Sequence, residues 1–83
     1  MKVQVKYFAS IREAIGVPSE QLETTAATLG ELRNMLLARS EAHAQSLAHG
    51  RALRMALNQV MAEESTALTE GAEVAFFPPV TGG

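Results

Sequence analysis

The residues of this sequence that could do chemistry are the last two, Gly82 and Gly83. Because glycine has no Cβ, two terminal glycines form a thin strip that can thread a narrow channel and present a carboxylate to the active site of another protein. A carboxylate becomes an acyl donor only after activation, and adenylation by ATP is the usual route. The sequence lacks a G-x-x-x-x-G-K phosphate-binding motif, so we expect a separate enzyme to activate Gly83.

A short stem connects these glycines to the rest of the chain. Pro78 and Pro79 have no backbone N–H to offer a neighbouring strand, so a sheet must stop before them. Each proline also favours an extended conformation in the residue before it. At about 3.3 Å per residue, residues 78–83 reach on the order of 20 Å. We therefore predict an extended tail whose end enters a partner protein. The docked stem would comprise Pro78, Pro79, Val80 and Thr81, with Gly82 in the channel and Gly83 as the reacting residue.

Composition argues against other kinds of chemistry. The sequence contains no cysteine, which excludes disulfides, thiolate metal sites and a cysteine nucleophile. His43 and His49 have no clear carboxylate partner, and we interpret them as surface residues rather than metal ligands. The formal net charge of −2 argues against nucleic acid as a partner. We therefore expect neither a bound metal nor a bound cofactor.

The beginning of the sequence bears on where the protein acts. Residues 1–6 contain no long apolar core and no cleavage-like site, so they do not resemble a signal peptide. No stretch approaches the ~20 apolar residues that span a membrane. We expect a cytoplasmic protein without a membrane partner.

Period-two alternation predicts two strands in the first part of the chain. Val3, Val5 and Tyr7 alternate with polar residues, which predicts a strand over 2–7 with one wet face. A weaker alternation predicts a second strand over 21–25, close enough to pair with the first as an antiparallel hairpin. Between them, residues 11–15 are predicted to form a helical turn that Gly16 stops.

The central part of the sequence predicts two helices. Thr28 and Glu31 match a capping box that begins the main helix, which we expect to end near Arg39. One helical stripe should face the core, and it comprises Leu29, Leu32, Met35 and Leu36. A second short helix is predicted over 40–48, with Ser40 as its cap and Gly50 as its stop. It is poor in large apolar residues, so we expect it on the surface.

Three further strands are predicted over 53–57, 60–62 and 73–77, with a turn at Asn58-Gln59 and another at Glu70-Gly71. In the last strand, Val74 and Phe76 should face the main helix, and Ala75 and Phe77 should face away. Strands packed on one main helix make an α+β domain with a mixed sheet. Phe77 would then be exposed beside the tail, as interface aromatics often are.

Three segments carry a resemblance to a known family. Residues 73–83 read Glu-Val-Ala-Phe-Phe-Pro-Pro-Val-Thr-Gly-Gly, residues 8–13 read Phe-Ala-x-x-Arg-Glu, and residues 56–59 read Ala-Leu-Asn-Gln. Together with the length and element order, these motifs make the chain resemble the small subunits of molybdopterin synthase, the MoaD family. Residues 41–51 are the least similar to that family.

The resemblance implies a ubiquitin-like β-grasp domain over 1–77 and an extended tail over 78–83. It implies that an E1-like enzyme adenylates the Gly83 carboxylate, which is then sulfurated to a thiocarboxylate. The tail would enter the large synthase subunit and donate sulfur to cyclic pyranopterin monophosphate, which becomes the dithiolene of molybdopterin. The synthase would be a heterotetramer whose catalytic groups lie in the large subunit, so the small subunit alone would not be an enzyme.

We predict three side chains at the partner interface. Phe77 is the expected anchor, Arg12 could pair with an acidic group of the partner, and Met61 is a weaker apolar anchor. The alternatives are a solvated charge for Arg12, a core position for Met61, and packing of Phe77 over the edge of its own core.

Other functions are compatible with the same carboxyl end. One is a ubiquitin-like protein modifier that forms isopeptide bonds through Gly83, and another is a sulfur carrier for thiamine-thiazole synthesis. The stem before the glycines favours molybdopterin over thiazole. A passive binding module with an incidental Gly-Gly end is the remaining alternative.

Overall fold

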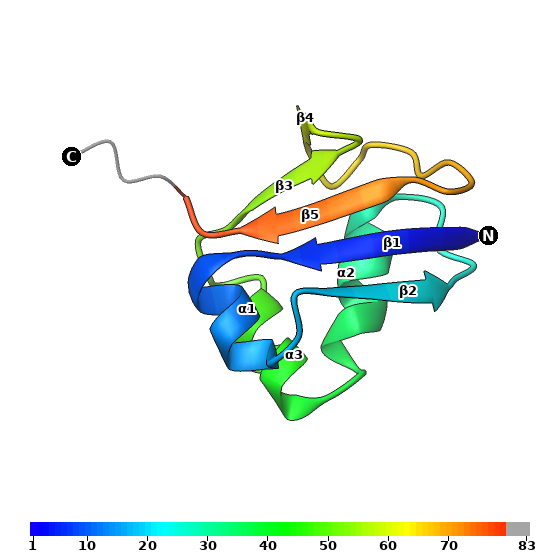
Figure 1. The fold of residues 1–83 in the computed structure, drawn as a ribbon. Helices are drawn as coiled ribbons and strands as arrows, with labels where there is room; N and C mark the ends of the chain where they lie inside the picture. Colours follow the sequence, from blue (N-terminus) through cyan, green and yellow to red (C-terminus); the bar gives the residue numbers. More distant parts are fainter. Residues whose placement is uncertain (80–83) are drawn as a thin grey trace.

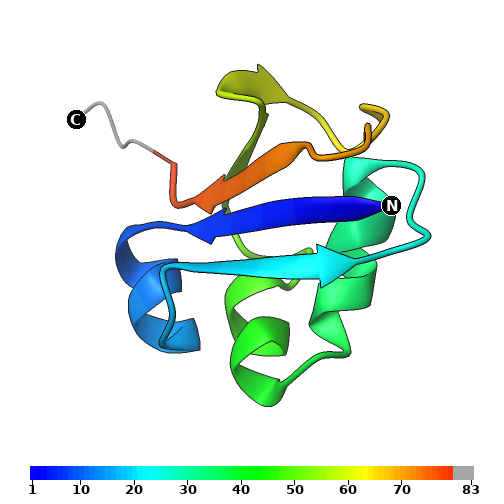
Figure 2. The same ribbon diagram turned by 45° about the vertical axis from the view of Figure 1, so that its right-hand side comes forward.

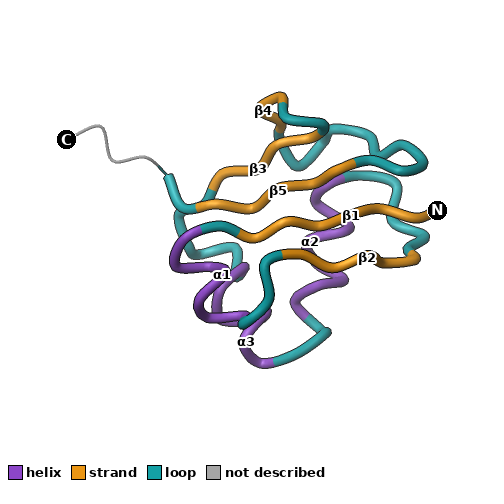
Figure 3. Tube along the Cα trace, viewed as in Figure 1, coloured by secondary structure: helices purple, strands orange, loops and turns teal. Residues whose placement is uncertain are grey.

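Five strands form one mixed sheet, and three helices lie together on one side of it (Figures 1 and 2). The computed structural model describes residues 1–79 of the 83-residue chain. Figure 3 follows the alternation of strands and helices along the chain. In order, the elements are β1 (Lys2–Tyr7), α1 (Ala9–Ile15), β2 (Ser19–Glu23), α2 (Leu29–Leu37), α3 (Glu41–Leu47), β3 (Arg54–Leu57), β4 (Val60–Ala62) and β5 (Glu73–Phe77).

The order of strands across the sheet is β2-β1-β5-β3-β4. The two terminal segments of the domain, β1 and β5, run parallel at its centre, and all other neighbours are antiparallel. The predicted hairpin of β1 and β2 is present, but β2 spans Ser19–Glu23 instead of residues 21–25. Leu22 is the single apolar residue of this strand, so alternation could not locate its start.

The core lies between the sheet and the helices. Val74 and Phe76 face the helices and are fully buried, as predicted. Each large apolar side chain taken out of water here contributes on the order of 1.5–3 kcal/mol. The largest fully buried side chains are Tyr7, Phe76, Leu29, Leu32, Leu36, Leu47, Val3, Val5 and Val74.

The main helix, α2, begins as predicted and differs in its inner face. The Thr28 hydroxyl accepts a hydrogen bond from the Glu31 N–H at 3.2 Å. The prediction that Met35 faces the core is wrong, because Met35 lies at the edge of the apolar stripe and is 38% exposed. Arg33 is buried on this helix instead. The helix ends at Leu37, two residues before the predicted Arg39.

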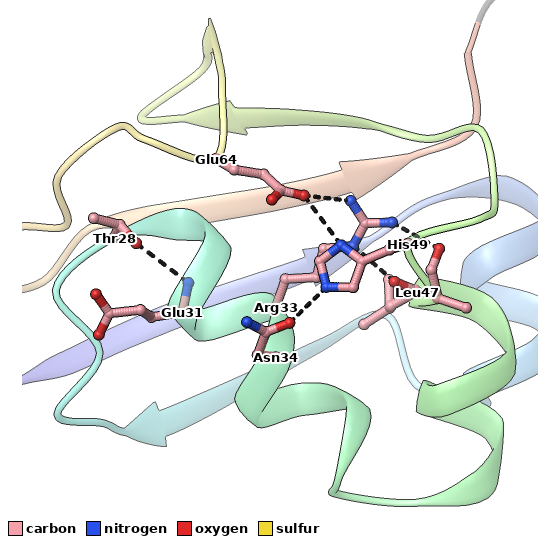
Figure 4. Close-up of polar contacts among 8 residues, drawn as sticks. Thr28, Glu31, Arg33, Asn34, Leu47, His49 and Glu64 are labelled. Atoms are coloured by element: carbon pink, nitrogen blue, oxygen red, sulfur yellow. Dashed lines mark hydrogen bonds and ion pairs between the residues drawn. The ribbon is translucent and has the colours of Figure 1, made fainter.

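The short helix α3 is more buried than predicted. His43, Ser46 and Leu47 are all buried, because α3 packs against both α1 and α2. The interpretation of His43 as a surface residue without a carboxylate partner is therefore wrong, since its ring contacts Ser40 and Glu20. The predicted glycine stop is also wrong, since α3 ends at Leu47 and only Gly16 and Gly71 among the described glycines adopt a positive φ. The carbonyl oxygens at this end accept hydrogen bonds from Arg33 (Figure 4).

A polar cluster around Glu20 ties α3 to the sheet. One carboxylate oxygen of Glu20 accepts a hydrogen bond from the Tyr7 hydroxyl at 2.8 Å and lies 2.8 Å from Nε2 of His43. The other oxygen accepts from Nε of Arg39 at 2.9 Å, and Ser40 Oγ contacts Nδ1 of His43 at 2.6 Å. Burial by itself would raise the pKa of Glu20, but the hydrogen bonds from His43, Tyr7 and Arg39 bring that pKa below its ordinary value of 4.5.

We expect this cluster to make the fold sensitive to acid. A depressed pKa in the folded protein adds stability above pH ~4.5, which is lost as the pH falls through the folded pKa and Glu20 binds a proton. Glu20→Gln should cost about 1–2 kcal/mol at pH 7, and the difference from the parent should shrink between pH 5 and pH 3. Urea denaturation across that range measures it, with exposed Glu13→Gln as the control. A constant difference at all pH values would contradict a charged Glu20.

Candidate docking face and tail

The sheet face opposite the helices carries an apolar hollow at the end where the tail leaves. This hollow is a cavity of about 700 Å³. We call its lining the docking face, and define it by the side chains of Lys6, Phe8, Ala9, Ala56, Gln59, Met61, Glu73, Ala75, Phe77, Pro78 and Pro79.

Strand register explains why these residues share one face. Directly paired residues of neighbouring strands point to the same side. Met61 on β4 pairs with Ala56 on β3, which pairs with Ala75 on β5, which pairs with Lys6 on β1. This row crosses four strands, and the two alanines at its centre leave room that larger side chains would fill.

Two aromatic rings border the hollow near the tail. Phe8 and Phe77 contact each other edge to face, with ring centroids 6.4 Å apart and planes at 85°. Phe8 is 43% exposed, whereas Phe77 is half-buried. Met61, 55% exposed, borders the hollow on β4. An apolar hollow with aromatic borders suits an apolar side chain of a partner protein.

Two of the predicted interface residues lie together in this face. Phe77 points away from the helices, as predicted, although it is less exposed than expected because Phe8 packs against it. Met61 lies on the same face and does not enter the core. Arg12 is exposed on α1 and does not line the hollow.

Phe8 is a residue of the docking face that was not predicted from the sequence. It follows β1 directly and forms the N-cap of α1, with an extended backbone at φ −128° and ψ 153°. Because that backbone continues the strand by one residue, Phe8 falls on the same face as Lys2, Gln4 and Lys6. Extending the alternation of β1 by one position would have identified it.

The described part of the tail belongs to the docking face. Pro78 and Pro79 are half-buried and line the hollow beside Phe77. Val80, Thr81, Gly82 and Gly83 lie outside the described residues, so their roles in the stem and the channel, and the domain boundary at residue 77, stay predictions.

Within residues 1–79, no group of three or more His, Cys, Asp or Glu side chains is placed to hold a metal ion. None of the helices described is long and apolar enough to cross a membrane.

The chain is similar to a known family and to proteins named as sulfur carrier subunits. A model of the ThiS family matches residues 5–83. The molybdopterin synthase sulfur carrier subunit of Escherichia coli K12 is 40% identical over 98% of this chain and 99% of its own length.

Solved structures are similar over the whole fold. A chain in the complex of subunits 1 and 2 of the molybdopterin-converting factor from Helicobacter pylori matches with a TM-score of 0.70 and 30% identity, covering both chains completely. SAMP1 from Haloferax volcanii matches with a TM-score of 0.78 and 26% identity, again over both complete chains. These likenesses confirm the predicted ubiquitin-like β-grasp fold.

Proposed function

The chain belongs to the ThiS family, and we propose from this membership that it is the sulfur carrier subunit of a molybdopterin synthase. The observation that carries the proposal is the E. coli relative of that name, which is 40% identical over almost the full length of both chains. A ThiS-type sulfur carrier for thiazole synthesis is the nearest alternative within the family. The high identity to a molybdopterin protein favours the first role.

The proposed chemistry takes place at the carboxyl group of Gly83. The carboxylate attacks the α-phosphate of ATP in an E1-like enzyme, which releases pyrophosphate and leaves an acyl-adenylate. A sulfide-level sulfur nucleophile then displaces AMP and leaves a thiocarboxylate. Two such carriers would each give one sulfur to cyclic pyranopterin monophosphate, forming the dithiolene of molybdopterin.

The docking face is the structural feature that favours a large synthase subunit as the partner. Phe8, Phe77 and Met61 offer an apolar surface at the base of the tail, so docking there would place the tail against the same partner. The solved complex from Helicobacter pylori contains subunits 1 and 2 of the molybdopterin-converting factor. We propose that a large synthase subunit covers this face in a heterotetramer and supplies the acid, base and electrostatic groups. The small domain itself would donate only sulfur.

Loading of sulfur at Gly83 tests the proposal. The full chain is incubated with an E1-like enzyme, ATP and a sulfur donor, and the carboxyl-terminal peptide is analysed by mass spectrometry. We expect one oxygen of Gly83 to be exchanged for sulfur, and no exchange in a variant that lacks Gly83. The loaded protein, mixed with large subunit and pterin precursor, should then form the dithiolene.

Two outcomes would support other functions. Gly83 joined to lysines of other proteins would favour a protein modifier. An unchanged mass with an enzyme that loads a known carrier would contradict activation altogether and favour a passive binding module.

A further inference from the structure

The sequence contains two lysines, Lys2 and Lys6, and both lie on β1. They differ in their relation to the tail. Lys6 lines the docking face together with Phe77, Pro78 and Pro79, whereas Lys2 lies at the opposite end of the strand and is exposed. Lys6 is therefore the lysine nearest the point where the tail leaves the sheet.

The amine of Lys6 is held by Glu73. Its Nζ lies 3.2 Å from Oε1 of Glu73, and the two side chains are only 36% and 26% exposed. Within residues 1–79, Lys2 forms no such ion pair. Partial burial distinguishes the Lys6–Glu73 pair from an ordinary surface pair, because water screens it less.

The Lys6–Glu73 ion pair also determines toward which end of β5 the Lys6 ammonium group points. Lys6 pairs in register with Ala75, near the middle of β5. Glu73 lies two residues before Ala75, and Phe77 lies two residues after it, next to the tail. The ion pair therefore draws the ammonium group toward the beginning of β5 and away from the tail.

We propose that Glu73 masks Lys6 and so protects this chain from acylating its own docking face. The inference rests on the proposed function, because only an activated carboxyl end creates the hazard. A free Lys6 amine that attacked the carbonyl carbon of an acyl-adenylate would form an amide and release AMP and a proton. The amide would use up the activated carboxyl end and leave a tail covalently attached to the docking face.

The masking follows from simple chemistry. Attack on an acyl carbon needs the nitrogen lone pair, which an ammonium group does not offer. In the ion pair the nitrogen faces the Glu73 carboxylate and is turned away from the tail. Residues 78–83 can span at most about 20 Å, so an amine beside Phe77 would be within reach of an activated end, from the same or a second copy.

Chemical acetylation tests the masking without any enzyme. The full chain is treated with a small water-soluble acetyl ester, and acetylation of Lys2 and Lys6 is followed by peptide mass spectrometry. We expect Lys6 to react more slowly than Lys2. Glu73→Gln should raise the Lys6 rate about two- to fivefold, the range for losing a partly exposed ion pair, and leave Lys2 unchanged.

A second variant guards against misfolding. Glu73→Asp keeps the charge but shortens the side chain, so it should raise the Lys6 rate in part while the fold, checked by thermal unfolding, is kept. Equal rates for Lys2 and Lys6, or no increase in either variant, would overturn the proposal.

Enzymatic activation separates this inference from the proposed function. With the E1-like enzyme and ATP but no sulfur donor, Glu73→Gln should accumulate more Gly83–Lys6 amide than the parent, and Lys6→Arg should abolish that amide. Pyrophosphate release without any increase in the amide would overturn the protective role alone. Absence of pyrophosphate release, with the acetylation result intact, would contradict the proposed function but not the masking of Lys6.

Discussion

Replacing Phe77 with aspartate is expected to weaken binding to the large subunit of molybdopterin synthase by about a hundredfold or more. Phe77 borders the apolar hollow at the base of the tail and packs against Phe8. Docking would bury it, and a carboxylate in its place would lose its water without gaining a partner. Isothermal titration of the purified large subunit with each variant measures the loss.

A matched control separates the docking face from general surface effects. Val17 is 39% exposed, close to the 43% of Phe8, and does not line the hollow. Val17→Asp should therefore bind as the parent does. Because Phe77 is half-buried, Met61→Asp provides a second test at a side chain whose change should leave the fold intact. If Phe77→Asp and Met61→Asp both bind like Val17→Asp, another surface docks the partner.

Phe8 and Phe77 should act together. Their edge-to-face contact predicts a coupling of about 0.5–1.5 kcal/mol between the two alanine substitutions in a double-mutant cycle of the free energy of unfolding. A coupling near zero would mean that the contact between the two rings adds nothing to the stability of the fold.

The strands with strong alternation were predictable because each has one buried and one wet face. For β1 and β5 this pattern identified both the strand and the inward residues, since Val5 and Val74 cannot move to the other face without exposing the core. The mixed arrangement of the sheet follows from which strands pair, and it agrees with the α+β prediction.

Elements held by polar contacts were less predictable. The beginning of β2 and the burial of α3 depend on Glu20, which joins His43 and Tyr7 from other parts of the chain. Periodicity within one segment contains no information about such partners. Met35 and Arg33 illustrate the same limit, because a hydropathy pattern favours burying the methionine, whereas the structure buries the arginine whose acceptors lie on α3.

The residues of the candidate site were likewise predictable only in part. Phe77 and Met61 were predicted separately, from alternation and residue type, and only the register of β3, β4 and β5 shows that they share a face. Phe8 was missed because it lies at a strand-to-helix junction. The importance of Gly82 and Gly83 rests on the sequence and the family, since the described residues end at Pro79.

Replacing Arg33 with alanine is expected to lower the free energy of unfolding by about 3 kcal/mol. Its guanidinium donates from Nε to the carbonyl of Leu47 and from Nη2 to the carbonyl of Ala48, both at 2.7 Å. Nη1 also donates to Glu64 at 2.9 Å, and the side chain is only 7% exposed (Figure 4).

The two carbonyls explain the size of the effect. The last carbonyls of a helix have no partner within it, and at the end of α3 Arg33 provides one while placing a positive charge near the negative end of the helix dipole. Without Arg33 both oxygens would need water in a region that is largely packed. A domain of this size has a total stability of only ~5–10 kcal/mol, so the loss would be readily measurable by urea denaturation.

The stability of a Glu64 variant shows whether Arg33 acts through its ion pair with Glu64 or through the carbonyls at the end of α3. The Glu64 side chain is half-exposed, so Glu64→Gln should cost less than ~1 kcal/mol, as expected for a surface ion pair. Arg33→Lys keeps the charge but cannot reach three acceptors in one plane, so its cost should lie between the two. Equal losses for Arg33→Ala and Glu64→Gln would mean that the ion pair, and not the helix end, is what Arg33 stabilises. We expect Arg33→Ala to be the least stable of the three variants, Arg33→Lys to be intermediate, and Glu64→Gln to be the most stable. That order would establish Arg33 as the C-terminal cap that α3 lacks in its own sequence.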